Sequence, residues 1–80
     1  MMTKALAKAL APGITVNSVA PGVIGLGDEG DAETQGMIRG TPMHRAGKPE
    51  EVADAVHFLL TAPEFITGQI LAVDGGLSQR

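Results

Sequence analysis

The chain of 80 residues has no cysteine, no tryptophan and no tyrosine, and its only aromatic side chains are two phenylalanines. Without cysteine, neither disulfide bonds nor a thiolate metal site can stabilise the fold, and a reducing compartment is compatible. Few aromatic side chains leave few large anchors for a core, and a chain this short buries only about 60% of its unfolded surface. These absences indicate part of a larger folded unit.

Long hydrophobic runs and clustered positive charges are also missing. No window is apolar for long enough to span a bilayer, and residues 1–8 show no secretory leader, so we expect a cytoplasmic protein with no membrane partner. The net charge of -3 and the six scattered Lys and Arg residues argue against a nucleic-acid partner. A hydrophobic content of 44% is typical of a globular protein.

Apolar periodicity predicts an α/β chain in the order helix, strand, lid, helix, strand. Residues 14–20 and 69–73 are short apolar runs closed by turn residues, which predicts two buried strands. A helix from Pro49 to about Ala62 lies between them, so the strands should be parallel. The first helix is amphipathic, and its apolar stripe comprises Met2, Ala5, Leu6, Ala9 and Leu10.

The segment of residues 25–47 is rich in glycine and acid, which predicts a mobile lid with a short helix at 32–38. Its start, Gly25 to Gly30, fits the letters G-x-G-x-x-G. Two carboxylates inside the match would repel phosphate, so we interpret the match as coincidental. The acids could be a cation site, but their spacing fits no calcium loop, and a solvated acidic lid is favoured: Asp28, Glu29, Asp31 and Glu33.

The remaining polar candidates do not assemble into a catalytic or metal-binding pattern. His57 lies opposite the apolar stripe of its helix and is expected to be exposed, and His44 is at most a contact of the lid with substrate. Ser18 and Ser78 have no His and Asp partners in a plausible arrangement, so a nucleophilic hydrolase is unsupported. We therefore predict no metal site and no catalytic residue within the chain.

Three segments in order and register resemble the C-terminal part of the short-chain dehydrogenase/reductase family. They are T-K-A-L-A-K-A-L-A-P-G-I-T-V-N-S-V-A-P-G-V-I from Thr3, G-K-P-E-E-V-A-D-A-V-H-F-L-L from Gly47, and I-T-G-Q-I-L-A-V-D-G-G from Ile66. The resemblance covers nearly the whole chain. It implies that residues 1–80 are the C-terminal segment of one doubly wound Rossmann domain, incomplete by itself, with these strands as the last two of its parallel sheet.

The resemblance also implies a cofactor contact at the end of the first strand. Pro21, Gly22, Val23 and Ile24 would meet the nicotinamide end of NADP or NAD, with backbone groups near Ile24 bonding the carboxamide. The family often has Thr two residues after that Ile, whereas this sequence has Leu26. The choice between NAD and NADP stays open, because the residue that reads the 2′ position lies in the other half of the family's fold.

The family's catalytic groups have no counterparts in this chain. Its glycine-rich turn, Asn-Ala-Gly segment, catalytic Ser and Tyr-x-x-x-Lys pair would all precede residue 1, and the sequence has no tyrosine. The expected partners are therefore the N-terminal half of the same protein, a small-molecule substrate and further copies in a homo-oligomer, a dimer or tetramer. In the family, the region corresponding to Asp74, Gly75 and Gly76 lies near a subunit interface, which implies a structural role.

The function that we expect of the parent protein is hydride transfer between NAD(P)H and a small carbonyl or imine. The acidic lid and the loss of the Thr favour the pteridine and dihydrofolate reductase subgroup, and an acidic carrier protein would be repelled by such a lid. The alternative is a ketoacyl or sugar-alcohol type reductase. An alternative of another class is a non-catalytic interaction module that docks through its first helix and last strand.

Overall fold

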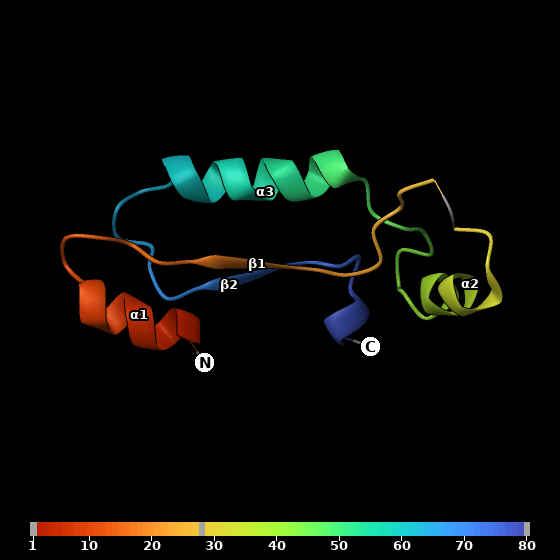
Figure 1. The fold of residues 1–80 in the computed structure, drawn as a ribbon, viewed down its shortest axis with the longest axis horizontal. Coiled ribbons are helices and arrows are strands. Elements are labelled where there is room, and N and C mark those ends of the chain that lie inside the picture. The colour runs from red at the N-terminus through yellow and green to blue at the C-terminus, as the bar shows by residue number, and fades with distance from the viewer. Residues whose placement is uncertain (1, 28, 80) are drawn as a thin grey trace.

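The computed structural model describes residues 2–27 and 29–79, in which one pair of parallel strands carries helices on both sides (Figure 1). Strand β1 pairs with β2 in the register Ser18 opposite Ile70 and Pro21 opposite Val73. Helix α3 lies in the connection from β1 to β2 and covers one face of the strand pair, while α1 lies on the other side (Figure 1). The elements are α1 (Met2–Leu10), β1 (Ser18–Pro21), α2 (Ala32–Arg39), α3 (Pro49–Thr61), β2 (Ile70–Val73) and the 3-10 helix η1 (Leu77–Gln79).

Helices α2 and α3 begin at residues that satisfy their free amide groups. Asp31 precedes α2 and its carboxylate Oδ2 accepts a hydrogen bond from the Thr34 N–H at 3.2 Å. Pro49 is the first residue of α3, where its missing N–H costs nothing. Glu51 reaches back from the first turn, and its Oε1 accepts from the Lys48 N–H at 2.9 Å. Local chemistry therefore fixes both helix starts.

Strand β1 is shorter than the predicted run of residues 14–20. The Val16 N–H donates to the Thr67 hydroxyl at 3.0 Å, so a side chain stands where a ladder partner would be. The Asn17 amide bridges the same loop, donating to the Ile66 carbonyl at 3.2 Å and accepting from the Gln69 N–H at 3.0 Å. These polar contacts hold the chain extended but replace the regular ladder, which begins only at Ser18.

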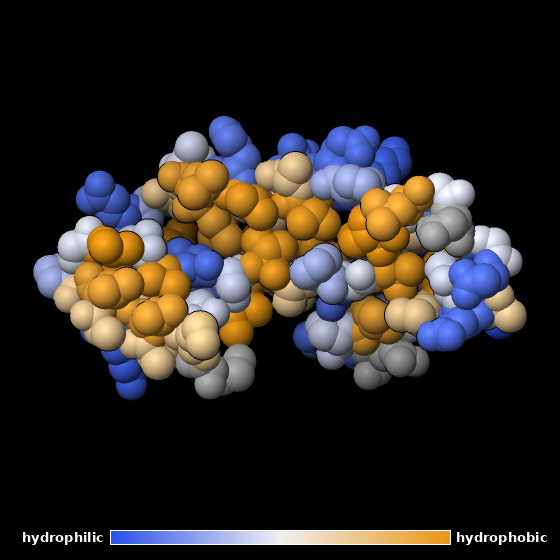
Figure 2. Space-filling model, viewed as in Figure 1, coloured by the Kyte–Doolittle hydropathy of each residue, from blue (hydrophilic) through white to orange (hydrophobic). Residues whose placement is uncertain are grey.

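The prediction of two buried strands is wrong for the chain by itself. Among the described residues, Ala7 is the one buried apolar residue and Thr41 the one buried polar residue. The radius of gyration is 14.9 Å, against about 12 Å expected of a compact domain of this length. Figure 2 shows apolar side chains spread across the middle of the molecule, where the strands lie. Two helices cannot cover both faces of the pair, so the strands stay exposed.

Helix α1 turns its apolar stripe away from the rest of the chain. Met2 is 77% exposed, and Leu6 and Leu10 are also exposed. The packed face instead carries Ala7, which lies 3.4 Å from the position a Cβ would take at Gly68. The stripe is thus free to meet another surface. No helix in residues 2–27 and 29–79 is both long and apolar enough to cross a membrane.

Candidate functional site

The β1 exit turn, residues 21–25, leaves the carboxyl end of β1 and is tied to two other segments. The Gly22 N–H donates to the Val73 carbonyl at 3.1 Å, which extends the contact with β2 by one residue. Gly47 then forms a parallel bridge to Ile24: its N–H donates to the Val23 carbonyl at 2.8 Å, and its carbonyl accepts from the Gly25 N–H at 2.8 Å. The turn is therefore held from both sides.

Gly22 is required by a close approach of the backbone that follows β2. A Cβ at this position would lie 2.8 Å from the Cβ of Asp74 and 2.9 Å from its Cα. Asp74 cannot move aside freely, because its carboxylate accepts from the Gly76 N–H at 3.0 Å and the Ser78 N–H at 3.1 Å. Hydrogen bonding from Ser78, and less so from Gly76, lowers the pKa of Asp74. The prediction that Asp74, Gly75 and Gly76 shape a turn is confirmed.

The peptide groups of Ile24 fit a carboxamide ligand. Because Gly47 bonds the groups flanking Ile24, the N–H and C=O of Ile24 itself point away from the bridge. A carboxamide has one carbonyl acceptor and an amino donor, which complement a backbone N–H and C=O. The turn also lies outside the carboxyl end of a parallel strand, where open α/β sheets bind ligands. The contact that the resemblance implies at residues 21–24 stays a prediction with a compatible geometry.

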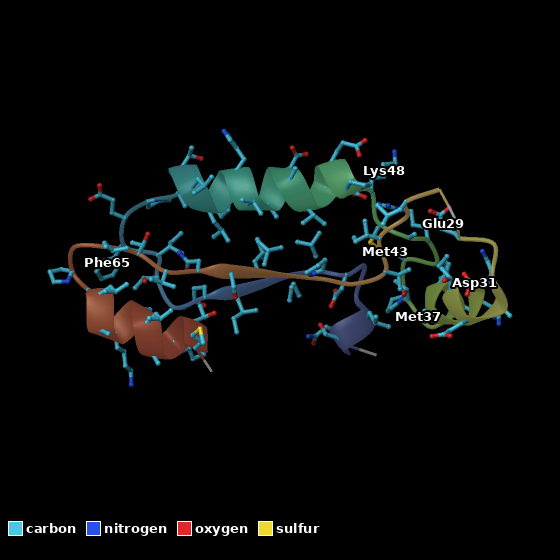
Figure 3. The ribbon with its side chains drawn as sticks, viewed as in Figure 1. Glu29, Asp31, Met37, Met43, Lys48 and Phe65 are labelled. Carbon is cyan, nitrogen blue, oxygen red and sulfur yellow. The ribbon has the colours of Figure 1, made fainter. Side chains whose placement is uncertain are left out.

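A cavity of about 320 Å³ lies beside the exit turn, between the end of β2 and the start of α3. Its walls come from three stretches that are distant in sequence, and Met43 is the residue that the lid contributes furthest from α3. In Figure 3, Met43 and Lys48 lie at the same end of the molecule as Glu29, with Phe65 at the opposite end. The lining residues are Val23, Met43, Arg45, Gly47, Glu51, Ala72, Val73, Asp74, Gly75 and Gly76.

One ion pair lies in the wall of this cavity. The Arg45 guanidinium donates to both carboxylate oxygens of Glu51, from Nη1 at 2.9 Å and Nη2 at 3.1 Å. Hydrogen bonding from Arg45, followed by the Lys48 N–H, lowers the pKa of Glu51 to about 2. The same contact raises the pKa of Arg45. The pair is therefore fully charged at neutral pH.

The lid packs on the strand ends through its second half. Thr41 is buried and its hydroxyl donates to the Met37 carbonyl at 2.9 Å. The Met43 N–H donates to the Gly75 carbonyl at 3.1 Å, and a Cβ at Gly75 would lie 2.8 Å from the Thr41 methyl group. Gly75 also has a φ of 61°, a conformation that other residues rarely adopt. The glycines after β2 thus allow the lid to approach closely.

The acidic residues of the lid have local structural roles. Asp31 caps α2, and hydrogen bonding from Thr34 lowers its pKa. Glu29 accepts from the Gly27 N–H at 3.0 Å, and Glu33 is an exposed residue of the first turn of α2. Asp28 lies outside the described residues. Nowhere in the part of the chain that the structure describes do three His, Asp or Glu side chains gather as a metal site requires.

The structure separates the other polar candidates from the exit turn. His57 is exposed on α3, as predicted, and His44 is exposed with a φ of 56° in the turn after α2. The Ser18 hydroxyl accepts from Thr3 at 3.2 Å, and Ser78 lies in η1. None of these side chains lines the cavity beside the exit turn.

Two contacts have no clear pattern in the sequence, one at the site and one at the amino end of β1. The Arg45–Glu51 pair spans a turn whose path cannot be derived from helix or strand periodicity. The one signal in the sequence is an Arg and a Glu on either side of Gly47 and Pro49. Asn17 lies within the run of residues 14–20 that predicts an apolar strand, but its amide bonds the loop before β2. A lone Asn within such a run is itself a signal of side-chain bonding to the backbone.

A parallel strand pair joined through a helix, with a turn at its carboxyl end, is typical of α/β sheets that bind nucleotides. A family model described as enoyl-(acyl carrier protein) reductase matches residues 1–78. The chain belongs to the short-chain dehydrogenase/reductase family. The expected α/β fold class and the incompleteness of the segment are confirmed.

Relatives from several organisms are similar across the chain. A 3-oxoacyl-[acyl-carrier-protein] reductase of Synechocystis sp. is 45% identical over 78 residues, which cover 94% of this chain and 32% of that protein. Carbonyl reductase family member 4 of Danio rerio is 49% identical over 76 residues, with 94% and 32% covered. The chain thus spans about a third of the length of these relatives.

Solved structures superpose over nearly the whole chain. An Agrobacterium tumefaciens protein provisionally named 2-deoxy-d-gluconate 3-dehydrogenase, with bound NADP, is 37% identical with a TM-score of 0.86, covering 99% of this chain and 35% of its own. Aldohexose dehydrogenase of Thermoplasma acidophilum, a C-terminal deletion mutant, is 38% identical with a TM-score of 0.82, covering 99% and 41%.

Proposed function

We propose that the complete protein transfers hydride between a nicotinamide cofactor and the carbonyl carbon of a small substrate. The observation that carries this proposal is the β1 exit turn, where the peptide groups of Ile24 point away from their bridge at the carboxyl end of the parallel pair. Membership of the family supports it. The Agrobacterium tumefaciens relative was solved with NADP, so NADP is the first cofactor to test, with NAD second.

The cofactor, when bound, supplies the hydride chemistry. The residues of this chain would bind and orient it: the Ile24 N–H and C=O bond the carboxamide, while Gly22 and Val23 set the path of the turn. Met43 and the rest of the lid cover the reacting end and exclude water. Reduction of a carbonyl also consumes a proton, and the resemblance assigns that donor to a Tyr-x-x-x-Lys pair preceding these residues.

A ketone of the 3-oxoacyl or sugar type is the substrate class that we favour. Relatives named for 3-oxoacyl carriers, gluconate and aldohexose substrates support it. The pterin-like alternative rests on the acidic lid and on Leu26 in place of the family's Thr.

Assembly into a dimer or tetramer is part of the proposal. The apolar stripe of α1 is exposed in the chain, with Leu6 and Leu10 each 41% exposed, and Ala5 and Ala9 would let a second helix approach closely. We also place the complete protein in the cytoplasm, which the lack of cysteine supports.

The complete protein should be tested with NADPH and NADH against a 3-oxoacyl thioester, a sugar lactone or ketose, and a dihydropterin. We expect loss of reduced-nicotinamide absorbance with the carbonyl substrates and a preference for one cofactor. If the dihydropterin is the only substrate that is turned over, the pterin-like alternative replaces the ketone as the substrate class. Failure to bind either cofactor would contradict the proposal and favour a non-catalytic interaction module.

A further inference from the structure

The segment that joins the lid to α3, residues 45–48, is fixed by a single carboxylate. Glu51 accepts three hydrogen bonds there: two from the Arg45 guanidinium, at 2.9 and 3.1 Å, and one from the Lys48 N–H at 2.9 Å. Arg45 also donates to the Ala46 carbonyl at 3.1 Å. Both ends of the segment are therefore bonded to one side chain of α3.

The same segment holds the exit turn through its central residue. Gly47 bonds the Val23 carbonyl and the Gly25 N–H, both at 2.8 Å, and so brackets Ile24. A Cβ at Gly47 would lie 3.1 Å from the Ile24 Cδ1, so the packing is close as well as hydrogen-bonded. The position of Ile24 therefore depends on where the segment places Gly47.

We infer that Arg45 and Glu51 are positioning residues for the exit turn: the ion pair holds residues 45–48, and Gly47 in turn holds Ile24. The consequence for the cofactor rests on the proposed function, whereas the coupling between the pair and the turn does not. Neither side chain of the pair forms a hydrogen bond with the exit turn in the described residues, so the hydrogen-bonded link between the pair and the turn runs through Gly47.

The exposure of the pair decides what kind of effect its removal has. The side chains of Arg45 and Glu51 are 46% and 40% exposed. An ion pair this exposed to water adds little to global stability. Two parallel hydrogen bonds between guanidinium and carboxylate nevertheless fix the orientation of the two groups relative to each other, which a single hydrogen bond from a lysine cannot do. Loss of the pair should therefore loosen the exit turn while the fold survives.

The first test is amide hydrogen exchange in the complete protein. The Gly25 and Gly47 N–H groups report the two bonds of the bridge directly. In Glu51→Gln their exchange should be about tenfold faster than in the unaltered protein, while amides of β2 are unchanged. The matched control is Glu50→Gln, which removes the neighbouring carboxylate of the same helical turn. Equal exchange in the two variants would overturn the inference.

The second test is cofactor binding by titration of NAD(P)H fluorescence. Glu51→Gln should weaken binding about three- to tenfold and raise KM for the cofactor, with a smaller change in kcat, because a loosened site must be ordered on binding. Arg45→Lys keeps the positive charge but loses the paired hydrogen bonds of the guanidinium, so its cofactor affinity should lie between those of the unaltered protein and Glu51→Gln. It replaces Glu51→Gln in this test if that variant fails to fold.

The outcomes separate the two proposals. If the unaltered protein binds neither cofactor, the proposed function fails, and amide exchange still decides whether the pair positions the turn. If it binds cofactor and both variants bind equally well, the positioning inference is overturned while the proposed function stands. Rescue of the Arg45→Glu defect by a second change, Glu51→Arg, would support the pair as the acting unit.

Discussion

Contacts within this chain cover the carboxyl end of the strand pair. They do not fully cover the faces of the same two strands. At the carboxyl end, Gly22 touches Asp74, Gly47 brackets Ile24, and Met43 bonds Gly75. On the faces, Ile70 and Leu71 of β2 remain exposed. The loops at the carboxyl end are therefore held by contacts within these residues, whereas the strand faces are left without full cover.

The largest expected effect comes from separating these residues from the rest of the protein. A polypeptide of residues 1–80 should show no NAD(P)H oxidation with any carbonyl or pterin substrate and no cooperative thermal unfolding, because its strand faces stay exposed. Absorbance of the reduced nicotinamide and differential scanning calorimetry check the two parts. The complete protein is the control, and turnover by the isolated residues after removal of contaminating reductases would contradict the prediction.

A second prediction concerns the close approach of Gly22 to Asp74 at the carboxyl end of the strands. Gly22→Ala in the complete protein should lower the free energy of unfolding by about 1–3 kcal/mol, because the added Cβ meets the backbone of Asp74 at 2.9 Å. Gly30→Ala is the matched control, since no atom of the described residues, apart from its two chain neighbours, lies within 4 Å of a Cβ there. Urea unfolding measures the stability of both variants. Equal midpoints would show that the turn can shift to accept a Cβ at Gly22 with no loss of unfolding free energy.

A third prediction concerns the exposed face of α1. Ala5→Glu or Ala9→Glu should weaken the oligomer of the complete protein at least about tenfold, by placing an unpaired charge in a packed seam. Lys8→Glu changes charge on another face of the same helix and should have less effect. Analytical ultracentrifugation decides the matter, and an unchanged oligomer with normal circular dichroism in both alanine variants would show that this face is not an interface.

The smallest effect should appear in the pH dependence of stability. The pKa of Glu51 is about 2 in the folded chain, against an ordinary value of 4.5. A lowered carboxyl pKa means that the ionised form favours folding, so this contribution is complete above about pH 4.5 and is lost as the pH falls towards 2. Thermal melts of Glu51→Gln should therefore show a shallower acid dependence in that window than melts of the unaltered protein.

Sequence patterns predicted the elements whose signals are local. Helix α3 runs over Pro49–Thr61 because Pro49 starts it and the apolar repeat continues to Leu60, and its end is as expected to within one residue. The extent of β1 was overestimated because Asn17 and Thr67 compete for backbone partners through side chains, which hydrophobic periodicity does not register. Periodicity also located the stripe of α1 but could not say which surface it meets.

The site was predictable only as a position. The resemblance to the family predicts a cofactor contact at residues 21–24, which stays a prediction, and the structure shows that strand β1 ends at Pro21. The parts that hold the turn could not be found in the same way. The Ile24 bridge to Gly47 and the Arg45–Glu51 pair depend on how the lid returns to α3, a long-range path that no short motif encodes.

The most direct test of the account follows the amide group of Ile24 in the complete protein as cofactor is added. Because the Ile24 N–H points away from its bridge to Gly47, it should exchange readily in the free protein and become protected at saturating NADPH or NADH. Its NMR resonance should shift in step with the fluorescence titration. A cofactor that binds with full affinity while the exchange and resonance of Ile24 stay unchanged would contradict the assignment of the exit turn as the nicotinamide contact.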